Sequence, residues 1–174
     1  MLWISSWGEN AMVQYLDSPV GILKLIADQR KLRSVELVER AGENRPNAPT
    51  EEAARQLREY FRGERKEFDL FLIYSGTNFE RLVWSAMSEI PYGKMVTYGQ
   101  LAAKIGQPTA CRAVANAVGK NPFLILLPCH RVVATHGLGG FSAGLEAKRK
   151  LLTLEGIEIS ESSVFSGKYL FTFS

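Results

Sequence analysis

The residues best equipped for chemistry are Cys129 and His130, which are adjacent in the sequence. They follow an apolar run of strand length, 122–127, that stops at Pro128. Buried strand ends of this kind are where α/β domains present reactive side chains. A free thiol has a pKa of about 8.5, so a nucleophilic cysteine needs a base or a stabilised anion at neutral pH. His130 is the only base nearby in the sequence, and the pair predicts thiol chemistry at Cys129.

The spacing of this pair raises a geometric difficulty. Adjacent residues of an extended chain point to opposite sides, so His130 reaches the sulfur of Cys129 directly only if the backbone turns sharply. A bridging water would also connect the two side chains. Both routes remain open from the sequence.

Two capping boxes precede the pair and predict the helices that must position it. Thr77 with Glu80 and Thr97 with Gln100 each have the spacing in which the first side chain and the last exchange hydrogen bonds with the backbone of a helix start. The second box opens a short helix, the sequence 106–109 breaks it, and another helix is expected from about 110 to 119. Helix, tight turn and helix form the outline of a helix-turn-helix, although other pairs of short helices share it.

The second of these helices carries mostly small residues on its outer surface, so a nucleic acid backbone could approach it closely. Arg112 is the one long cation there. A planar guanidinium can stack on and hydrogen-bond to a base. A solvated helix residue is the alternative for Arg112.

The remaining elements follow from apolar periodicity. Before the first capping box we expect a small α/β lobe with no catalytic constellation, made of strands at 12–16, 21–27 and 32–39, a loop at 41–50, a helix at 51–62 and a further strand at 66–74. The helix after Thr77 is expected to bury Phe79, Leu82, Val83, Ala86, Met87 and Ile90, and a final helix is expected at 145–154.

Composition excludes several classes of protein. At 174 residues the chain can form one domain or two small ones, and it has no run of about 20 apolar residues for a membrane span. Its start lacks the pattern of a signal peptide, which predicts a cytoplasmic protein, and either Met1 or Met12 could be the true start. Two cysteines and two histidines are too few for a disulfide framework or a cysteine-rich zinc site, so we expect no metal.

Charge is unevenly distributed along the chain. Residues 91–150 hold eight basic residues and one acid, a net +7, whereas the rest holds 13 basic and 17 acidic residues, a net −4. A basic half beside an acidic half suits a protein that offers one face to a polyanion. An uneven but purely solvated surface would give the same count.

The pentapeptide 128–132, Pro-Cys-His-Arg-Val, resembles the active-site signature of the methylated-DNA--protein-cysteine methyltransferases, DNA repair proteins that remove alkyl groups from the O6 atom of guanine. The similarity extends over roughly 77–156. It implies an α/β fold with a ribonuclease H-like sheet and helix in an N-terminal lobe, 1–75, and a mostly helical C-terminal lobe, 76–160, with a winged-helix-like helix-turn-helix. No role follows for a tail at 161–174.

The resemblance implies a catalytic set. Cys129 takes the alkyl group and is not regenerated, and His130 acts on it through a water while Glu155 orients the imidazole. Asn121 braces the active-site turn, and Tyr98 donates a proton toward the guanine ring. Glu155 also stands out by itself, because the C-terminal end of a helix disfavours an anion.

Each of these residues has a plainer alternative: Glu155 on a frayed helix end, Asn121 in an ordinary turn, and Tyr98 as a buried phenol bonded to a backbone carbonyl.

The glycine-rich sequence 137–144 lacks the spacing of a phosphate-binding loop. The resemblance makes it a wall of the guanine pocket, with the backbone of Ser142 near O6 and the carbonyl of Val132 on the amino group of the base. Phe141 departs from the family, since relatives often have Tyr there, and Ala115 stands where many have Gly. Both departures bear on which alkyl groups or DNA contexts are accepted.

Alkylated DNA is the implied partner. The second helix would lie in the minor groove, Arg112 would enter the duplex where the damaged nucleotide has rotated out, and Ala110, Ala113 and Thr97 would contact DNA. The expected reaction is irreversible transfer from O6-alkylguanine, and from O4-alkylthymine, to Cys129 in a cofactor-free monomer. The alternatives are a lesion sensor without transfer, a cysteine hydrolase and a helix-turn-helix regulator.

Overall fold

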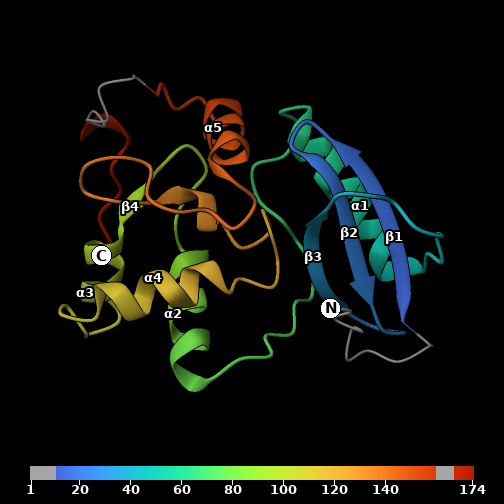
Figure 1. Ribbon diagram of the computed structural model, residues 1–174, viewed down its shortest axis with the longest axis horizontal. Coiled ribbons are helices and arrows are strands. Elements are labelled where there is room, and N and C mark those ends of the chain that lie inside the picture. Colours follow the sequence, from blue (N-terminus) through green and yellow to red (C-terminus); the bar gives the residue numbers. More distant parts are fainter. Residues whose placement is uncertain (1–10, 160–166) are drawn as a thin grey trace. The chain divides into compact units, whose positions relative to one another are not determined.

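The computed structural model describes residues 11–159 and 167–174. The chain divides into two compact units, 1–73 and 74–174 (Figure 1). Met1, the predicted last residue of the C-terminal lobe at 160, and residues 161–166 of the predicted tail lie outside the described residues.

The N-terminal unit is an antiparallel sheet with one helix on it. Strands β1 (Met12–Ser18), β2 (Gly21–Ala27) and β3 (Leu32–Val38) pair in the order β1-β2-β3, and helix α1 (Ala48–Phe61) packs against all three. Leu23 and Leu25 of β2 are fully buried, as is Leu57 of α1. The predicted strands are confirmed, because residues two apart on a strand share a face that the helix covers.

Helix α1 begins at Ala48, three residues earlier than predicted, so the prediction of a loop over the whole of 41–50 was wrong for its last residues. Asn47 caps the helix by accepting a hydrogen bond from the backbone of Thr50, whose side chain returns the bond. Pro49 therefore sits in the first turn, where a missing N–H leaves no helical hydrogen bond unmade.

The strand predicted at 66–74 is absent among the described residues, and only one bridge, between Leu32 and Leu72, forms there. The side chain of Gln56 takes the place of a neighbouring strand at Asp69: its Oε1 accepts the Asp69 N–H at 2.9 Å and its Nε2 donates to the Asp69 carbonyl at 2.9 Å. A helix side chain thus satisfies backbone groups that the sequence pattern assigned to a sheet.

The C-terminal unit is mostly helical. Its helices are α2 (Asn78–Ser88), α3 (Tyr98–Lys104), α4 (Cys111–Gly119) and α5 (Leu145–Leu154), and a two-stranded parallel sheet joins β4 (Val96–Thr97) to β5 (Val132–Val133). Both capping boxes are confirmed, at Thr77 and Thr97. Helices α3 and α4 pack on each other and on α2.

The buried face of α2 differs in part from the prediction. Leu82 is 46% exposed, whereas Trp84, which the periodicity did not select, is buried and donates its indole N–H to the carbonyl of Ala117 at 2.8 Å. This hydrogen bond links α2 to α4, so a tertiary contact determines that Trp84 lies on the buried face of α2.

Residues 123–127 of the apolar run are buried but do not form a strand, so the prediction of a strand end at Cys129 was wrong. Ile125 has φ of 73°, a left-handed conformation that breaks extended pairing. A short 3-10 helix, η1 (Cys129–Arg131), follows Pro128.

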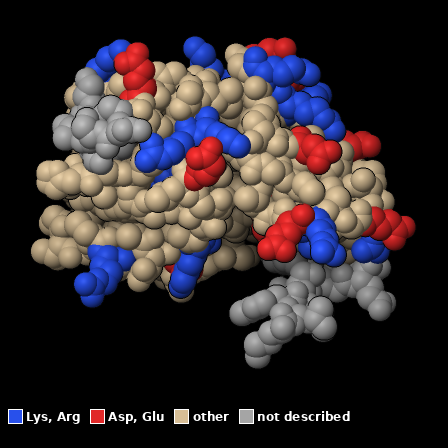
Figure 2. All heavy atoms as spheres, turned by 45° about the horizontal axis from the view of Figure 1, so that its top comes forward, with Lys and Arg blue, Asp and Glu red and all other residues tan. Residues whose placement is uncertain are grey.

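Acidic and basic side chains alternate over the N-terminal unit in Figure 2. Several form ion pairs between neighbours on or near α1, such as Arg55 with Glu52 and Arg65 with Glu59. These pairs fit the expected solvated surface. No helix within the described ranges is long and apolar enough to cross a membrane.

Candidate active site

Cys129 lies at the start of the 3-10 turn η1 and is 3% exposed. The turn supplies the sharp change of direction that an extended chain would lack. Asn121 braces it: its Nδ2 donates to the Leu127 carbonyl at 2.9 Å and to Cys129 Sγ at 3.1 Å, and its Oδ1 accepts the N–H of Phe123 at 2.8 Å. Asn121 is therefore more than a turn residue, since one amide contacts both the backbone and the sulfur.

The ring of His130, the second residue of the turn, contacts Glu155. His130 Nε2 lies 2.7 Å from Glu155 Oε1, and both side chains are fully buried. His130 Nδ1 is buried without a hydrogen-bond partner among the described residues. Because a carboxylate only accepts hydrogen bonds, Nε2 carries the proton, and Nδ1 is left as an acceptor.

Glu155 is a buried hub and not a surface residue at a frayed end. Arg131 donates to both of its carboxylate oxygens, from Nε and Nη2, each at 2.9 Å. The N–H of Gly93 adds a hydrogen bond to Oε2 at 3.1 Å. The two-pronged pairing offsets the carboxylate charge and fixes its orientation toward His130.

Arg131 is a residue whose role the sequence analysis did not predict. It is buried, and its Nη1 also donates to the Ile90 carbonyl at 2.7 Å. Its position directly after the Cys-His pair was the only available signal.

The pKa shifts describe a neutral resting pair. Burial raises the pKa of the Cys129 thiol, an effect that the hydrogen bond from Asn121 and the charge of Lys148 oppose. Burial lowers the pKa of His130, although the carboxylate of Glu155 opposes this shift. The pKa of Glu155 lies well below its usual range despite its burial, because His130 and Arg131 stabilise its anion. A thiol, a neutral imidazole and a carboxylate are the resting forms at neutral pH.

A pocket of about 350 Å³ opens at the sulfur. Five residues singled out from the sequence line it, namely Cys129, Tyr98, Ala115, Phe141 and Ser142. The others are Gly140 and three further residues of α4, Asn116, Val118 and Gly119. The volume lies in the range typical of sites for small molecules or single bases.

Tyr98 stands across the pocket at the start of α3. Its hydroxyl lies 3.4 Å from the carbonyl of Gly140, a long hydrogen bond, and burial raises its pKa, so it stays protonated at neutral pH. A Cβ on Gly139, where φ is 71°, would lie 2.8 Å from the Tyr98 ring. The glycine-rich loop therefore needs glycine at Gly139 for both backbone conformation and space.

Lys148 is a second residue that the sequence analysis did not select. It is fully buried in α5, and its ammonium donates to the carbonyls of Val132, Leu138 and Gly140 at 2.6, 2.5 and 3.0 Å. Burial lowers its pKa to about 8. The Lys148 ammonium thus binds three backbone carbonyls of β5 and the loop that forms the pocket wall. No sequence pattern distinguished Lys148 from the exposed basic residues beside it in α5.

Val132 is not among the residues that line the pocket. Its side chain is buried in β5 and its carbonyl accepts the hydrogen bond from Lys148. A carbonyl oxygen has two lone pairs, so a second donor could still bind it.

The residues expected to contact DNA lie around α4. Arg112 and Ala113 are exposed on this helix, and Ala110 is its half-buried N-cap residue. Thr97 caps α3 and is half-buried. The exposed positive charge is smaller than the sequence count implied, because Arg131 and Lys148 are buried.

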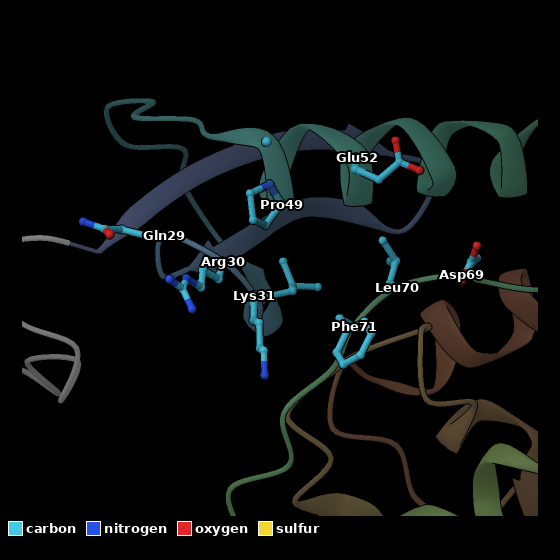
Figure 3. A pocket seen from close by; sticks show the side chains of 10 residues that line it. Gln29, Arg30, Lys31, Pro49, Glu52, Asp69, Leu70 and Phe71 are labelled. Atoms are coloured by element: carbon cyan, nitrogen blue, oxygen red, sulfur yellow. The ribbon is translucent and has the colours of Figure 1, made fainter.

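The N-terminal unit has a hollow of about 350 Å³ between the turn that follows β2, the start of α1 and residues 69–71. Figure 3 shows Lys31 beside Phe71, and the ammonium lies 5.4 Å from the ring centroid. The lining residues include no thiol, hydroxyl or imidazole. Across the described parts of both units, no three His, Cys, Asp or Glu side chains are grouped to hold a metal ion.

Comparison with known proteins agrees with both units. Residues 12–73 match the model of the 6-O-methylguanine DNA methyltransferase ribonuclease-like domain, and residues 78–157 match that of the DNA binding domain of the same family. The methylated-DNA--protein-cysteine methyltransferase of Methanosarcina acetivorans is 43% identical over 150 residues, covering 80% of this chain and 95% of that protein.

Crystal structures of Mycobacterium tuberculosis proteins are also similar. The O6-methylguanine methyltransferase is 39% identical with a TM-score of 0.77, covering 83% of this chain and 92% of that one. A complex of Mycobacterium tuberculosis OGT with DNA is 40% identical, with the same TM-score and the same coverage. These similarities confirm the fold predicted from the sequence, and the chain belongs to the 6-O-methylguanine DNA methyltransferase family.

Proposed function

We propose that this protein repairs DNA by transferring the alkyl group of O6-alkylguanine directly and irreversibly to Cys129. One observation supports the assignment of Cys129 above all. Cys129 lines a pocket of suitable size, while the Nδ1 atom of the adjacent His130 is buried without a hydrogen-bond partner among the described residues and its Nε2 atom is held by Glu155.

The thiol must lose its proton during the reaction, because burial keeps it neutral at rest. His130 accepts that proton at Nδ1, through a bridging water. The imidazolium that forms is stabilised by Glu155, 2.7 Å from Nε2. This arrangement of nucleophile, base and orienting carboxylate is known from other nucleophilic sites.

The bonds balance in a single displacement. The Cys129 sulfur attacks the alkyl carbon, the bond between that carbon and O6 breaks, and its electron pair returns to the guanine. Tyr98 donates its phenolic proton to the base, since a guanine anion is a poor leaving group. His130 then gives up the proton it gained and Tyr98 recovers one, which leaves guanine and an S-alkyl cysteine.

The thioether is stable, so one molecule of protein repairs one lesion. Thymine alkylated at O4 presents the same kind of carbon–oxygen bond, and we extend the proposal to it. No cofactor takes part in this scheme.

The loop after β5 would hold the flipped base. In this proposal the backbone of Ser142 lies near O6, the second lone pair of the Val132 carbonyl accepts from the amino group of the base, and Phe141 packs on it. Lys148 supports the proposal by fixing the carbonyls of this loop.

DNA would bind along α4 by its minor groove. The lesion must leave the stack to reach a buried sulfur, at a cost of a few kcal/mol. Arg112 would fill the vacated position, and Ala110, Ala113 and Thr97 would contact the strands. The exposure and small size of the α4 residues support this binding mode.

The N-terminal unit would serve as a structural domain, with boundaries close to 1–75 and 76–160, and the protein would act as a monomer. A single active site and a one-to-one stoichiometry need no second copy.

The decisive experiment is incubation with duplex DNA containing one O6-methylguanine, followed by mass mapping of peptides. We expect a gain of one methyl group on the peptide that contains Cys129. Cys129→Ser should abolish the gain, and Cys111→Ser is the matched control, because Cys111 is the other cysteine in the chain and is exposed.

The same assay separates the alternatives. A lesion sensor would bind the duplex but leave Cys129 unmodified, and a cysteine hydrolase would release product over many turnovers. A helix-turn-helix regulator would bind undamaged DNA by sequence with an inert thiol. Methyl transfer by the Cys129→Ser variant would refute the proposal.

A further inference from the structure

The C-terminal segment 167–174 lies beyond the residues 78–157 that match the family, yet it belongs to the same compact unit as the pocket. It starts with a 3-10 turn, η2 (Gly167–Tyr169), and then runs beside Met95, which precedes β4 (Figure 1). The Met95 N–H donates to the Tyr169 carbonyl at 2.8 Å, and the Phe171 N–H donates to the Met95 carbonyl at 2.8 Å. The segment therefore pairs with the chain in the manner of a parallel strand.

A second attachment runs through Gln100. Its Oε1 accepts the N–H of Thr97 at 2.8 Å and so completes the cap of α3, while its Nε2 donates to the Phe171 carbonyl at 3.2 Å. One side chain thus links the start of α3 to the C-terminal segment.

Side chains of the segment strengthen the attachment. Tyr169 is 7% exposed and belongs to a buried cluster with Met95, Val133 and Leu138. The ammonium of Lys104, in the last turn of α3, lies 5.1 Å from the ring centroid of Phe173. The segment is therefore held at both ends of α3 as well as at Met95.

These contacts bracket Tyr98. Met95 lies three residues before it and Gln100 lies two residues after it, and Tyr98 is the first residue of α3. The Tyr98 side chain lines the pocket, and its hydroxyl makes only a long, weak hydrogen bond, to the Gly140 carbonyl. The direction of the phenol therefore depends mainly on the position of the Tyr98 backbone.

We propose that the segment 167–174 positions Tyr98 for proton donation to the departing base. The inference rests on the proposed function, because it assumes that Tyr98 is the proton donor in alkyl transfer. Phe171 and Gln100 are positioning residues in this scheme, since they act on the reaction only through Tyr98.

Two substitutions loosen the attachment in different ways. Gln100→Glu keeps an oxygen for the N–H of Thr97, and hence the cap, but removes the donor to Phe171. Phe171→Pro removes the N–H that binds the Met95 carbonyl. The matched controls are Gln107→Glu and Ser174→Pro, because the Gln107 side chain and the backbone N–H of Ser174 make no hydrogen bond within the described residues.

The test variants should affect methyl transfer and the intrinsic reactivity of the Cys129 thiol differently. We expect each test variant to lower the single-turnover rate of methyl transfer from duplex DNA by about tenfold, the equivalent of one or two hydrogen bonds. Alkylation of Cys129 by iodoacetamide needs no proton donor, so its rate should stay within about twofold of the parent. The controls should change neither rate.

A Tyr98→Phe background completes the test, because it lacks the phenolic proton. There, Gln100→Glu and Phe171→Pro should cause no further loss of transfer. Equal losses in both backgrounds, unchanged transfer in both test variants, or a parallel fall of the iodoacetamide rate would overturn the inference and leave the segment a packing role. A parent protein that transfers no methyl group at all would refute the proposed function, and this inference with it.

Discussion

Glu155 holds His130 by one ring nitrogen, with Oε1 2.7 Å from Nε2, and Nδ1 is the nitrogen left without a partner among the described residues. The carboxylate thus selects the tautomer in which Nδ1 can accept a proton. Arg131 holds the same carboxylate through both oxygens. A buried ion pair between Arg131 and Glu155 thus fixes the orientation of the His130 ring.

Glu155→Gln should cost both stability and activity. It leaves the Arg131 guanidinium buried without a counter-charge, and breaking a buried ion pair in this way costs about 3–5 kcal/mol. The amide could also present its N–H to Nε2 and reverse the tautomer. Urea unfolding and single-turnover transfer measure the two effects. Glu146→Gln, on the exposed side of α5, is the control and should change the free energy of unfolding by less than about 0.5 kcal/mol.

The pH dependence of transfer follows from the lowered pKa of His130. Because burial pushes this pKa below its ordinary 6.5, the imidazole remains neutral, and able to accept a proton, at pH 6.5 and somewhat below. Transfer should therefore be level from pH 7.5 to 6.5 and fall only at lower pH. Single-turnover rates across this range test the prediction, and a half-maximal rate at or above pH 6.5 would contradict it.

Stability should decline on acidification through the same residue. The folded state takes up the His130 proton at lower pH than the unfolded state, so below pH 6.5 the unfolded state binds more protons and is stabilised relative to the folded state. Glu155 adds a second loss as the pH falls below its ordinary pKa of 4.5, because its folded pKa is also lowered. Urea titrations at several pH values measure both effects.

His130→Gln should flatten the decline near pH 6. His136→Gln is the control, because His136 is the other histidine and is exposed. An equal flattening in the control would show that the decline has another source.

Lys148→Met should disorder the pocket wall. The buried carbonyls of Val132 and Leu138 would lose their donor, and each unsatisfied group costs about 1–3 kcal/mol, so we expect a loss of at least about 2 kcal/mol in the free energy of unfolding. The thiol pKa of Cys129 should rise further, since the charge of Lys148 lowers it. Unfolding and thiol titration are the measurements.

Lys150→Met is the matched control for this change, because it removes a lysine from an exposed position of the same helix. If the pKa of Cys129 in Lys148→Met is the same as in the parent protein, the two residues are not electrostatically coupled.

Arg112→Ala should separate DNA handling from chemistry. If Arg112 fills the space of the flipped nucleotide, its loss should slow transfer from duplex DNA by about tenfold, or about 1.4 kcal/mol, and spare transfer from free O6-methylguanine base. Arg149→Ala, an exposed arginine of α5, is the control. Equal slowing on the duplex and on the free base would contradict this role.

The sequence by itself determined the helices with strong local signals. The capping boxes at Thr77 and Thr97 each place donor and acceptor within one turn, so no distant residue is needed to form them. It also determined the family, through the pentapeptide 128–132 and its flanks. The nucleophile candidate, Cys129, followed from its place beside His130 within that motif.

Tertiary structure decided what depends on residues far apart in sequence. Glu155 and Arg131 meet across 24 residues, and Lys148 reaches the Val132 carbonyl across 16. The run 122–127 looked like a strand because burial and strand pairing favour the same apolar residues, but Asn121 holds the chain in a turn. Periodicity records which residues are buried, whereas the partner of a buried charge is fixed only when the chain folds back on itself.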